Sequence, residues 1–101
     1  MITLVAIAQA KPGREKLLEE TLLALVPQTR QEAGCLNYDL HRSMNKPGMF
    51  MFYENWVDRA ALEKHGMMPY MVDLRAKAAD LLAEPLQIEL YEMISQQIAS
   101  K

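Results

Sequence analysis

Cysteine and glycine are scarce in this chain of 101 residues, and their scarcity excludes several kinds of site. Cys35 is the only cysteine, so it can form neither an intrachain disulfide nor a cysteine-based metal site. The four glycines are far apart, which excludes a glycine-rich loop for binding phosphate. The two histidines, His41 and His65, lack the spacing of a helical metal-binding pair. No serine lies in the setting of a nucleophile elbow.

A strong charge of one sign and a long apolar run are also lacking. The chain has 11 Lys and Arg against 13 Asp and Glu, with no basic stripe that would indicate a nucleic-acid partner. Its first residues, Met1 to Ala8, are too few for a membrane span and lack the basic start of a signal peptide. We expect a cytoplasmic protein without a membrane partner, folded as one domain over residues 1–101 with a flexible tail from residue 95.

The hydrophobic pattern predicts a strand, a helix and a hairpin in the first half of the chain. Residues 2–10 are β-branched or apolar on both faces, as in a strand that is covered on both sides. Leucines at helical spacing predict a helix over residues 13–33, broken at Pro27 and ended by a left-handed Gly34. Residues 35–44 and 49–57 predict two strands around the turn-rich loop Asn45–Gly48.

The second half predicts two helical segments and a last strand. Asp58 is a suitable N-cap for a helix that ends near His65, before Gly66 and Pro69. A further helix is expected over residues 70–83 and a strand over residues 86–94. The order β-α-β-β-α-β is that of an α+β ferredoxin-like fold, with one antiparallel sheet and helices on one face only.

The face of such a sheet that carries no helices must be covered by another layer. A two-sided first strand and three methionines near the hairpin favour a C2 homodimer with sheet-to-sheet packing, a dimeric α/β-barrel-type assembly. These methionines are Met44, Met49 and Met51. The alternative is that they fill gaps within a monomer.

The register of the hairpin decides which polar side chains share a face. A loop of four residues pairs Met44 with Met49 and so places Asp39 opposite Glu54. Two facing carboxylates would raise one pKa if both were desolvated, and one could then act as a general acid. The alternative is a solvent-exposed Asp39, and a slip by one residue would exchange the faces. The side chains expected on one face are Asn37, Asp39, His41, Phe52, Glu54 and Trp56, and those on the other are Tyr38, Leu40, Tyr53 and Asn55.

His65 and Trp56 each have two interpretations. In a pocket, His65 could take a proton from a phenol or hydroquinone, because imidazole titrates near neutrality. As a structural residue, it would use one ring nitrogen to tie down the end of its helix. Trp56 could likewise line an aromatic pocket or fill the core, with its indole N–H bonded to one acceptor.

Four segments of the sequence together resemble a known family. They are Lys11–Arg14, Glu32–Tyr38, Phe52–Trp56, and Asp58–His65. In order and spacing they are similar to the antibiotic biosynthesis monooxygenase domain family, from Met1 to about Ile94. The resemblance implies a ferredoxin-like protomer and a dimer with face-to-face sheets. It points to the small bacterial quinol monooxygenases, which oxidise dihydroxylated or polycyclic aromatics with O2 and without flavin, metal or haem.

The resemblance also assigns roles by position. Glu54, Trp56 and His65 match the family's recurrent residues on the third strand and second helix, and Tyr38 matches its second-strand tyrosine. The aromatic polyketide oxygenases of the family resemble one another in an Asn-x-x-x-Trp arrangement. In this chain Phe52 lies four residues before Trp56, in place of that asparagine. Haem-degrading relatives have an asparagine on the first strand, and residues 1–10 contain none, which argues against haem.

The leading hypothesis is therefore a cofactor-independent monooxygenase that uses O2 as co-substrate on a small phenolic or hydroquinone-type aromatic compound. His65, assisted by Glu54 or Asp39, would deprotonate the substrate, with Trp56 and His41 as further catalytic candidates. One alternative is an isomerase or enolising enzyme on the same scaffold. Another is a dimeric ligand-binding or stress protein without catalysis. The candidates for substrate binding are Phe52, Asn37, Tyr38, Met67 and Met68.

Overall fold

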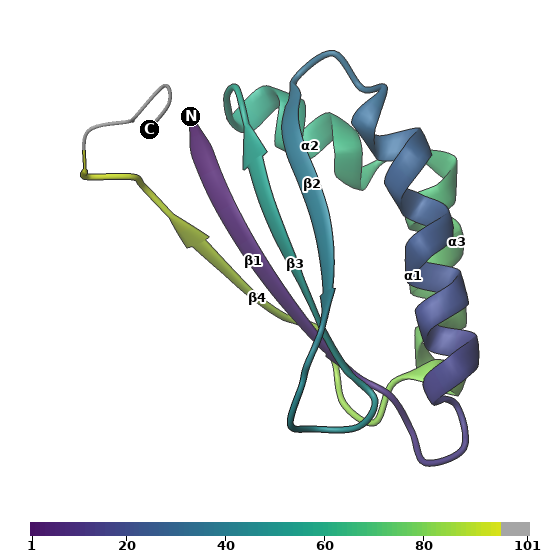
Figure 1. Ribbon diagram of the computed structural model, residues 1–101. Helices are drawn as coiled ribbons and strands as arrows, with labels where there is room; N and C mark the ends of the chain where they lie inside the picture. Colours follow the sequence, from purple (N-terminus) through teal and green to yellow (C-terminus); the bar gives the residue numbers. More distant parts are fainter. Residues whose placement is uncertain (96–101) are drawn as a thin grey trace.

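The computed structural model describes residues 1–95. Its elements, in chain order, are β1 (Ile2–Gln9), α1 (Glu15–Arg30), β2 (Cys35–Arg42), β3 (Met49–Trp56), α2 (Arg59–Gly66), α3 (Pro69–Leu81) and β4 (Gln87–Tyr91). The strands form one antiparallel sheet in the order β2-β3-β1-β4, and the helices lie on one face of it (Figure 1). The predicted α+β ferredoxin-like fold is confirmed, with the second helical region divided into α2 and α3.

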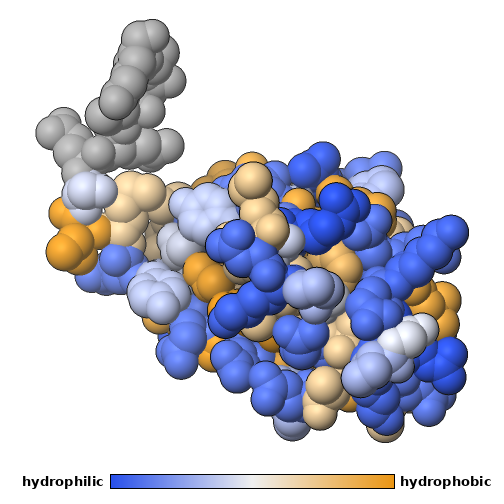
Figure 2. All heavy atoms as spheres, turned by 60° about the horizontal axis from the view of Figure 1, so that its bottom comes forward, coloured by the Kyte–Doolittle hydropathy of each residue, from blue (hydrophilic) through white to orange (hydrophobic). Residues whose placement is uncertain are grey.

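The core lies between the helices and one face of the sheet. Alternate residues of β1, among them Ala6 and Ala8, are buried against this layer, because side chains two apart point the same way. Leu18 and Leu22 of α1 are each 1% exposed and lie in the same cluster. The small alanines let the helices approach the sheet closely. Hydrophilic side chains cover most of the outer surface in Figure 2, with apolar ones scattered between them.

The predicted end of the first helix is wrong in two respects. α1 continues through Pro27 to Arg30 instead of breaking at the proline. Pro27 cannot donate to the carbonyl of Leu23, but both residues lie on the exposed side of the helix, so this carbonyl can meet solvent. Gly34 is not left-handed; among residues 1–95 only Gly13 and Gly48 have a positive φ. A Cβ at position 34 would collide with Ala61 of α2, so close packing requires this glycine.

The predicted register of the hairpin is wrong by one residue. β2 ends at Arg42, and Ser43 N donates to Met49 O at 2.9 Å, so Met44 belongs to the loop and is 99% exposed. The Ser43 hydroxyl accepts from the backbone N–H groups of Asn45 and Lys46, which stabilises this wider loop. Tyr38 therefore lies opposite Glu54, where Asp39 was expected.

The register exchanges the faces of β2. Tyr38, with Leu40, shares the helix-covered face with Glu54 and Trp56. Three polar residues of β2, by contrast, lie on the open face together with Tyr53 and Asn55. These polar residues are Asn37, Asp39 and His41. Sequence alternation thus identified the strands but placed β2 with the wrong side toward the helices.

The last strand pairs with the outer edge of β1 and is exposed on both sides. Ile88 and Leu90 point toward the helix side of the sheet, yet they are 54% and 42% exposed. The expected tail lies outside the described residues from position 96 onward. Over residues 1–95, none of the helices combines the length and the apolar character that crossing a membrane requires.

Candidate active site

Four buried side chains meet under α2, at the end of the sheet where β3 stops. Trp56 is the last residue of β3, and Asp58, two residues later, caps α2 by accepting from Ala61 N at 2.8 Å. This predicted cap is confirmed, and it turns the chain back so that His65 lies over the Trp56 ring, with ring centroids 4.7 Å apart. Tyr38 packs edge-on against His65 at 5.5 Å. Trp56, Tyr38, Glu54 and His65 are all at most 4% exposed.

The hydrogen-bond partner of His65 is Glu32. Nδ1 of His65 lies 2.8 Å from Oε2 of Glu32, and the hydroxyl of Tyr70 donates to the same oxygen. The side chains of His65 and Glu32 are only 5% and 10% exposed. Glu32 lies in the turn between α1 and β2, and Tyr70 in the first turn of α3. His65 of α2, Glu32 of the turn and Tyr70 of α3 are thus joined by hydrogen bonds to one carboxylate oxygen.

The other ring nitrogen of His65, Nε2, differs from Nδ1 in its contacts. No described residue forms a hydrogen bond with Nε2. Among residues 1–95, the Thr29 hydroxyl is the only fully buried side-chain N or O atom without a hydrogen bond of normal geometry, although it lies beside the Tyr38 and Tyr70 hydroxyls. Nε2 has no partner among these residues either; unlike the Thr29 hydroxyl it is not completely buried, although His65 as a whole is only 4% exposed.

Glu54 lies beside Trp56, as the alternation along β3 predicted. The indole Nε1 of Trp56 donates to Oε1 of Glu54 at 2.9 Å. Burial raises the pKa of Glu54 to about 7, while the indole bond lowers it and the nearby Glu32 raises it further. The carboxylate neighbour of Glu54 is thus Glu32 rather than the predicted Asp39. Near neutral pH, Glu54 can exist with or without its proton.

Three predicted site residues lie on the other side of the sheet. Asn37, Asp39 and His41 point to the open face, so Asp39 cannot assist His65. Asp39 instead binds Arg30 at 3.0 Å and accepts from Asn37 at 3.0 Å. The chain of hydrogen bonds continues to Asn55, whose side-chain amide donates to Oδ1 of Asn37 at 2.8 Å. The structure therefore separates the predicted residues into a helix-side cluster and an open-face chain.

Two hollows in the surface border on Glu32. One, of about 550 Å³, lies between the α1–β2 turn and α2, and the other, of about 380 Å³, lies beside α3. They share Gln31, Glu32 and Met68, so the predicted Met68 lines both. Met67 is 72% exposed and lines neither hollow. Phe52 is part of the core, packed against Tyr38 with ring centroids 4.6 Å apart.

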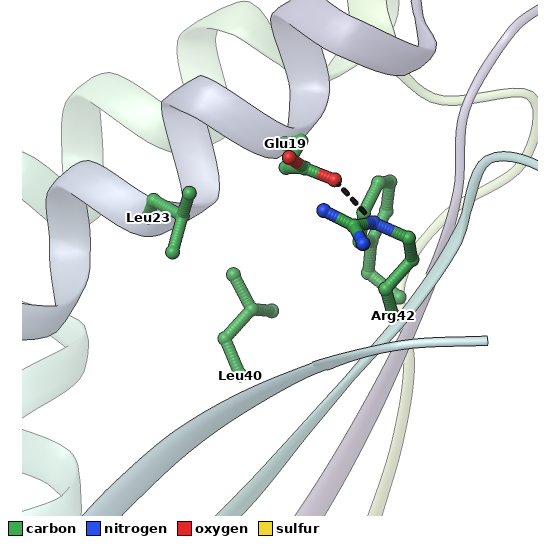
Figure 3. A pocket seen from close by; sticks show the side chains of 5 residues that line it. Glu19, Leu23, Leu40 and Arg42 are labelled. Carbon is green, nitrogen blue, oxygen red and sulfur yellow. Dashed lines mark hydrogen bonds and ion pairs between the residues drawn. The ribbon is translucent and has the colours of Figure 1, made fainter. Parts of the chain in front are cut away.

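A third hollow lies between α1 and the edge strand β2, toward the hairpin. Figure 3 shows Leu23 of α1 and Leu40 of β2 pointing toward each other, while Arg42 reaches across to Glu19. The hollow measures about 200 Å³, and the Arg42–Glu19 contact is 2.7 Å. None of its lining residues belongs to the cluster around His65. No sequence motif indicated this hollow.

Glu32 is the site residue that sequence reasoning missed. Its contact with His65 spans 33 positions of the chain, and no local periodicity connects a turn with a later helix. The signal that existed was its place just before Gly34, in a turn that must pack closely on α2. Within residues 1–95, no group of three or more His, Cys, Asp or Glu side chains is arranged to hold a metal ion.

Known proteins of similar sequence and structure share this arrangement of elements. Residues 1–77 match the sequence model of the family described as "Antibiotic biosynthesis monooxygenase". "Putative monooxygenase YcnE" of Bacillus subtilis is 34% identical over 94 residues, which cover 92% of this chain and 98% of that protein. "Uncharacterized protein sll1783" of Synechocystis is 30% identical over 88% of this chain, which spans only 60% of that relative. The crystal structure of PA3566 from Pseudomonas aeruginosa superposes with a TM-score of 0.89 at 36% identity, covering 93% of this chain and 94% of that one.

Proposed function

Because the chain belongs to the antibiotic biosynthesis monooxygenase family, we propose that it oxidises a small phenolic or hydroquinone-type aromatic compound with O2 and without a cofactor. The names of the family and of the related YcnE support a monooxygenase-type function. The substrate class and the lack of a cofactor follow from the resemblance to quinol monooxygenases and are part of the proposal.

The observation that carries the proposal is the state of His65. Its Nδ1 is bonded to Glu32, its Nε2 has no partner among residues 1–95, and its ring packs against those of Trp56 and Tyr38. An imidazole held in this way can take a phenolic proton at Nε2, while the adjacent carboxylate stabilises the imidazolium that forms. Two hollows border on Glu32, the partner of Nδ1, although His65 itself lines neither of them. The access of a small aromatic ring to Nε2 is therefore part of the proposal.

The chemistry balances without an external reductant. After His65 takes the phenolic proton, the substrate anion gives one electron to O2, and the two radicals combine at a ring carbon. The resulting peroxide loses water and leaves a carbonyl. The substrate thus loses its phenolic hydrogen and one ring hydrogen as water, gains one oxygen atom and becomes a quinone. The second atom of O2 is in the water.

The test is oxygen consumption by the purified protein with a panel of hydroquinones and anthrones. His65→Gln should reduce uptake by about 10²-fold or more, as expected for loss of a general base. His41→Gln is the matched control, because His41 is exposed on the open face, and it should keep full uptake. Melting curves of both variants check that they fold.

Three outcomes would overturn the proposal. The first is no uptake above the uncatalysed rate with any compound of the panel. The second is turnover that continues without O2, which would favour the isomerase or enolising enzyme. The third is a compound that raises the melting temperature but remains chemically unchanged, which would favour a ligand-binding protein.

We also propose that the protein is a homodimer that covers the open face of the sheet. Val5, Ile7, Met49 and Met51 lie half-buried on that face, with no element of residues 1–95 over them. Ile7→Glu should convert a dimer to a monomer in light scattering after gel filtration, because it would bury a charge between sheets. Val72→Glu, on an exposed part of α3, is the control. A monomeric parent protein would contradict this proposal.

A further inference from the structure

Glu32, which the sequence did not indicate as a site residue, binds His65 through one ring nitrogen only. We propose that Glu32 is a positioning residue, which keeps the proton of neutral His65 on Nδ1 and leaves Nε2 as the base. This inference rests on the proposed function for its catalytic meaning, since the proton that Nε2 takes is the substrate's. Its structural content can be measured without any substrate.

The hydrogen bonds fix the tautomer. Oε2 of Glu32 receives the Tyr70 hydroxyl and also lies 2.8 Å from Nδ1 of His65. An ionised carboxylate only accepts hydrogen bonds, so Nδ1 must carry its hydrogen. Neutral imidazole has one N–H and one lone pair, and the lone pair is therefore on Nε2. Without Glu32, no other described group is bonded to either nitrogen to prefer one tautomer.

The fold places Glu32 rigidly. Gly34, two residues later, packs against Ala61 so closely that a side chain would not fit. Its carbonyl accepts from Val57 N at 2.9 Å, which ties the turn to the start of α2. The carboxylate is thus held against the helix that carries His65. The ring of His65 is in turn held by its contacts with Trp56 and Tyr38.

The neighbouring tyrosine and cysteine side chains stay protonated at neutral pH, so they do not compete with His65 as a base. The pKa of Tyr70 is raised to about 12 by burial and by its bond to Glu32, so Tyr70 stays a donor at neutral pH. Burial, Glu32 and Glu54 raise the pKa of Cys35 to about 11, so its thiol stays protonated. Burial also raises the pKa of Tyr38. Glu32 also borders two surface hollows, so a small molecule can approach the carboxylate of the pair.

The first test is nitrogen NMR of isotope-labelled protein without substrate. The chain has two histidines, so His65 can be assigned by its loss in His65→Gln, and His41 is an internal control. In the parent protein and in Tyr70→Phe, His65 should carry its hydrogen on Nδ1. Glu32→Leu should show both tautomers, while Glu32→Gln, which keeps an acceptor oxygen, should restore the Nδ1–H form. A pure Nδ1–H tautomer in Glu32→Leu would overturn the proposal.

The second test is oxygen uptake by the same variants. Glu32→Leu should lose about 10²-fold, and Glu32→Gln about 10-fold, because the amide restores the tautomer but not the charge that offsets the imidazolium. Full uptake by Glu32→Gln would contradict the charge role even if Glu32→Leu fails to fold. If the NMR result is as expected but the parent protein consumes no O2 with any compound, the positioning role is supported and the proposed reaction fails.

Discussion

The two faces of the sheet hold different kinds of polar side chain. The helix-covered face buries ionisable groups, Glu54 and His65, among aromatic rings. The open face carries a chain of mostly neutral groups, in which Thr3 donates to Asn55 at 2.5 Å and Asn55 donates to Asn37. Ionisable groups in a buried setting can change protonation state near neutral pH, whereas amides and hydroxyls only hold geometry. The ionisable groups that the proposed function requires therefore lie under the helices, and the open face holds a hydrogen-bonded chain of amides and a hydroxyl.

The largest expected effect comes from removing the ring at the centre of the helix-side cluster. Trp56 is 0% exposed, so Trp56→Ala should lower the free energy of unfolding by about 3–5 kcal/mol through lost packing. Tyr53 is three positions earlier on β3 but 37% exposed on the open face, and Tyr53→Ala should cost about 1 kcal/mol. Urea denaturation of both variants measures the difference. Equal losses would show that the two faces are equally packed.

The second prediction uses the raised pKa of Glu54. Between pH 4.5 and 7, the unfolded chain loses this proton first, so the free energy of unfolding should fall as pH rises, by up to about 3 kcal/mol. Above pH 7, Glu54 is ionised in both states and the loss is complete. Glu54→Gln has no such proton, so its stability relative to the parent should increase across this range. A difference that stays constant with pH would contradict the buried setting of Glu54.

The sequence predicted the elements better than their contacts. β3 and the cap at Asp58 were predicted correctly because alternation and capping depend on neighbouring residues. The face of β2 depended on whether Met44 belongs to the strand or to the loop, and the Ser43 hydroxyl decided this through backbone contacts that no periodicity shows. A one-residue error there moved Asp39 and His41 to the wrong side.

The sequence predicted only part of the candidate site. Glu54, Trp56 and His65, which were candidates from the sequence, lie together because two are on one strand and the third is near the end of the short helix α2. Glu32 was missed because its position depends on how tightly the turn at Gly34 packs on α2. Such a contact is set by tertiary packing, and a lone glycine before a strand is equally typical of a helix end.

A smaller effect is expected for the polar chain of the open face. Asn55 is 5% exposed and bonded to both Thr3 and Asn37, so Asn55→Ala should cost about 2 kcal/mol by leaving these groups unpaired. Thr3→Val should cost about 1 kcal/mol. The double variant Thr3→Val with Asn55→Ala should lose less than the sum of the two single losses, because both partners of one bond are removed together. Additive losses would show that the two residues act independently.

The smallest effect is expected for Asp39, the residue that sequence alone placed beside Glu54. Its partner is Arg30 at 3.0 Å, and the two side chains are 41% and 56% exposed. Asp39→Asn should therefore change the free energy of unfolding by less than about 1 kcal/mol, and high salt should remove most of that difference. The variant should also keep the fall in stability between pH 4.5 and 7, because that fall belongs to Glu54. If Asp39→Asn instead reduced oxygen uptake as strongly as His65→Gln, proton chemistry would involve both faces, and the division between them would be wrong.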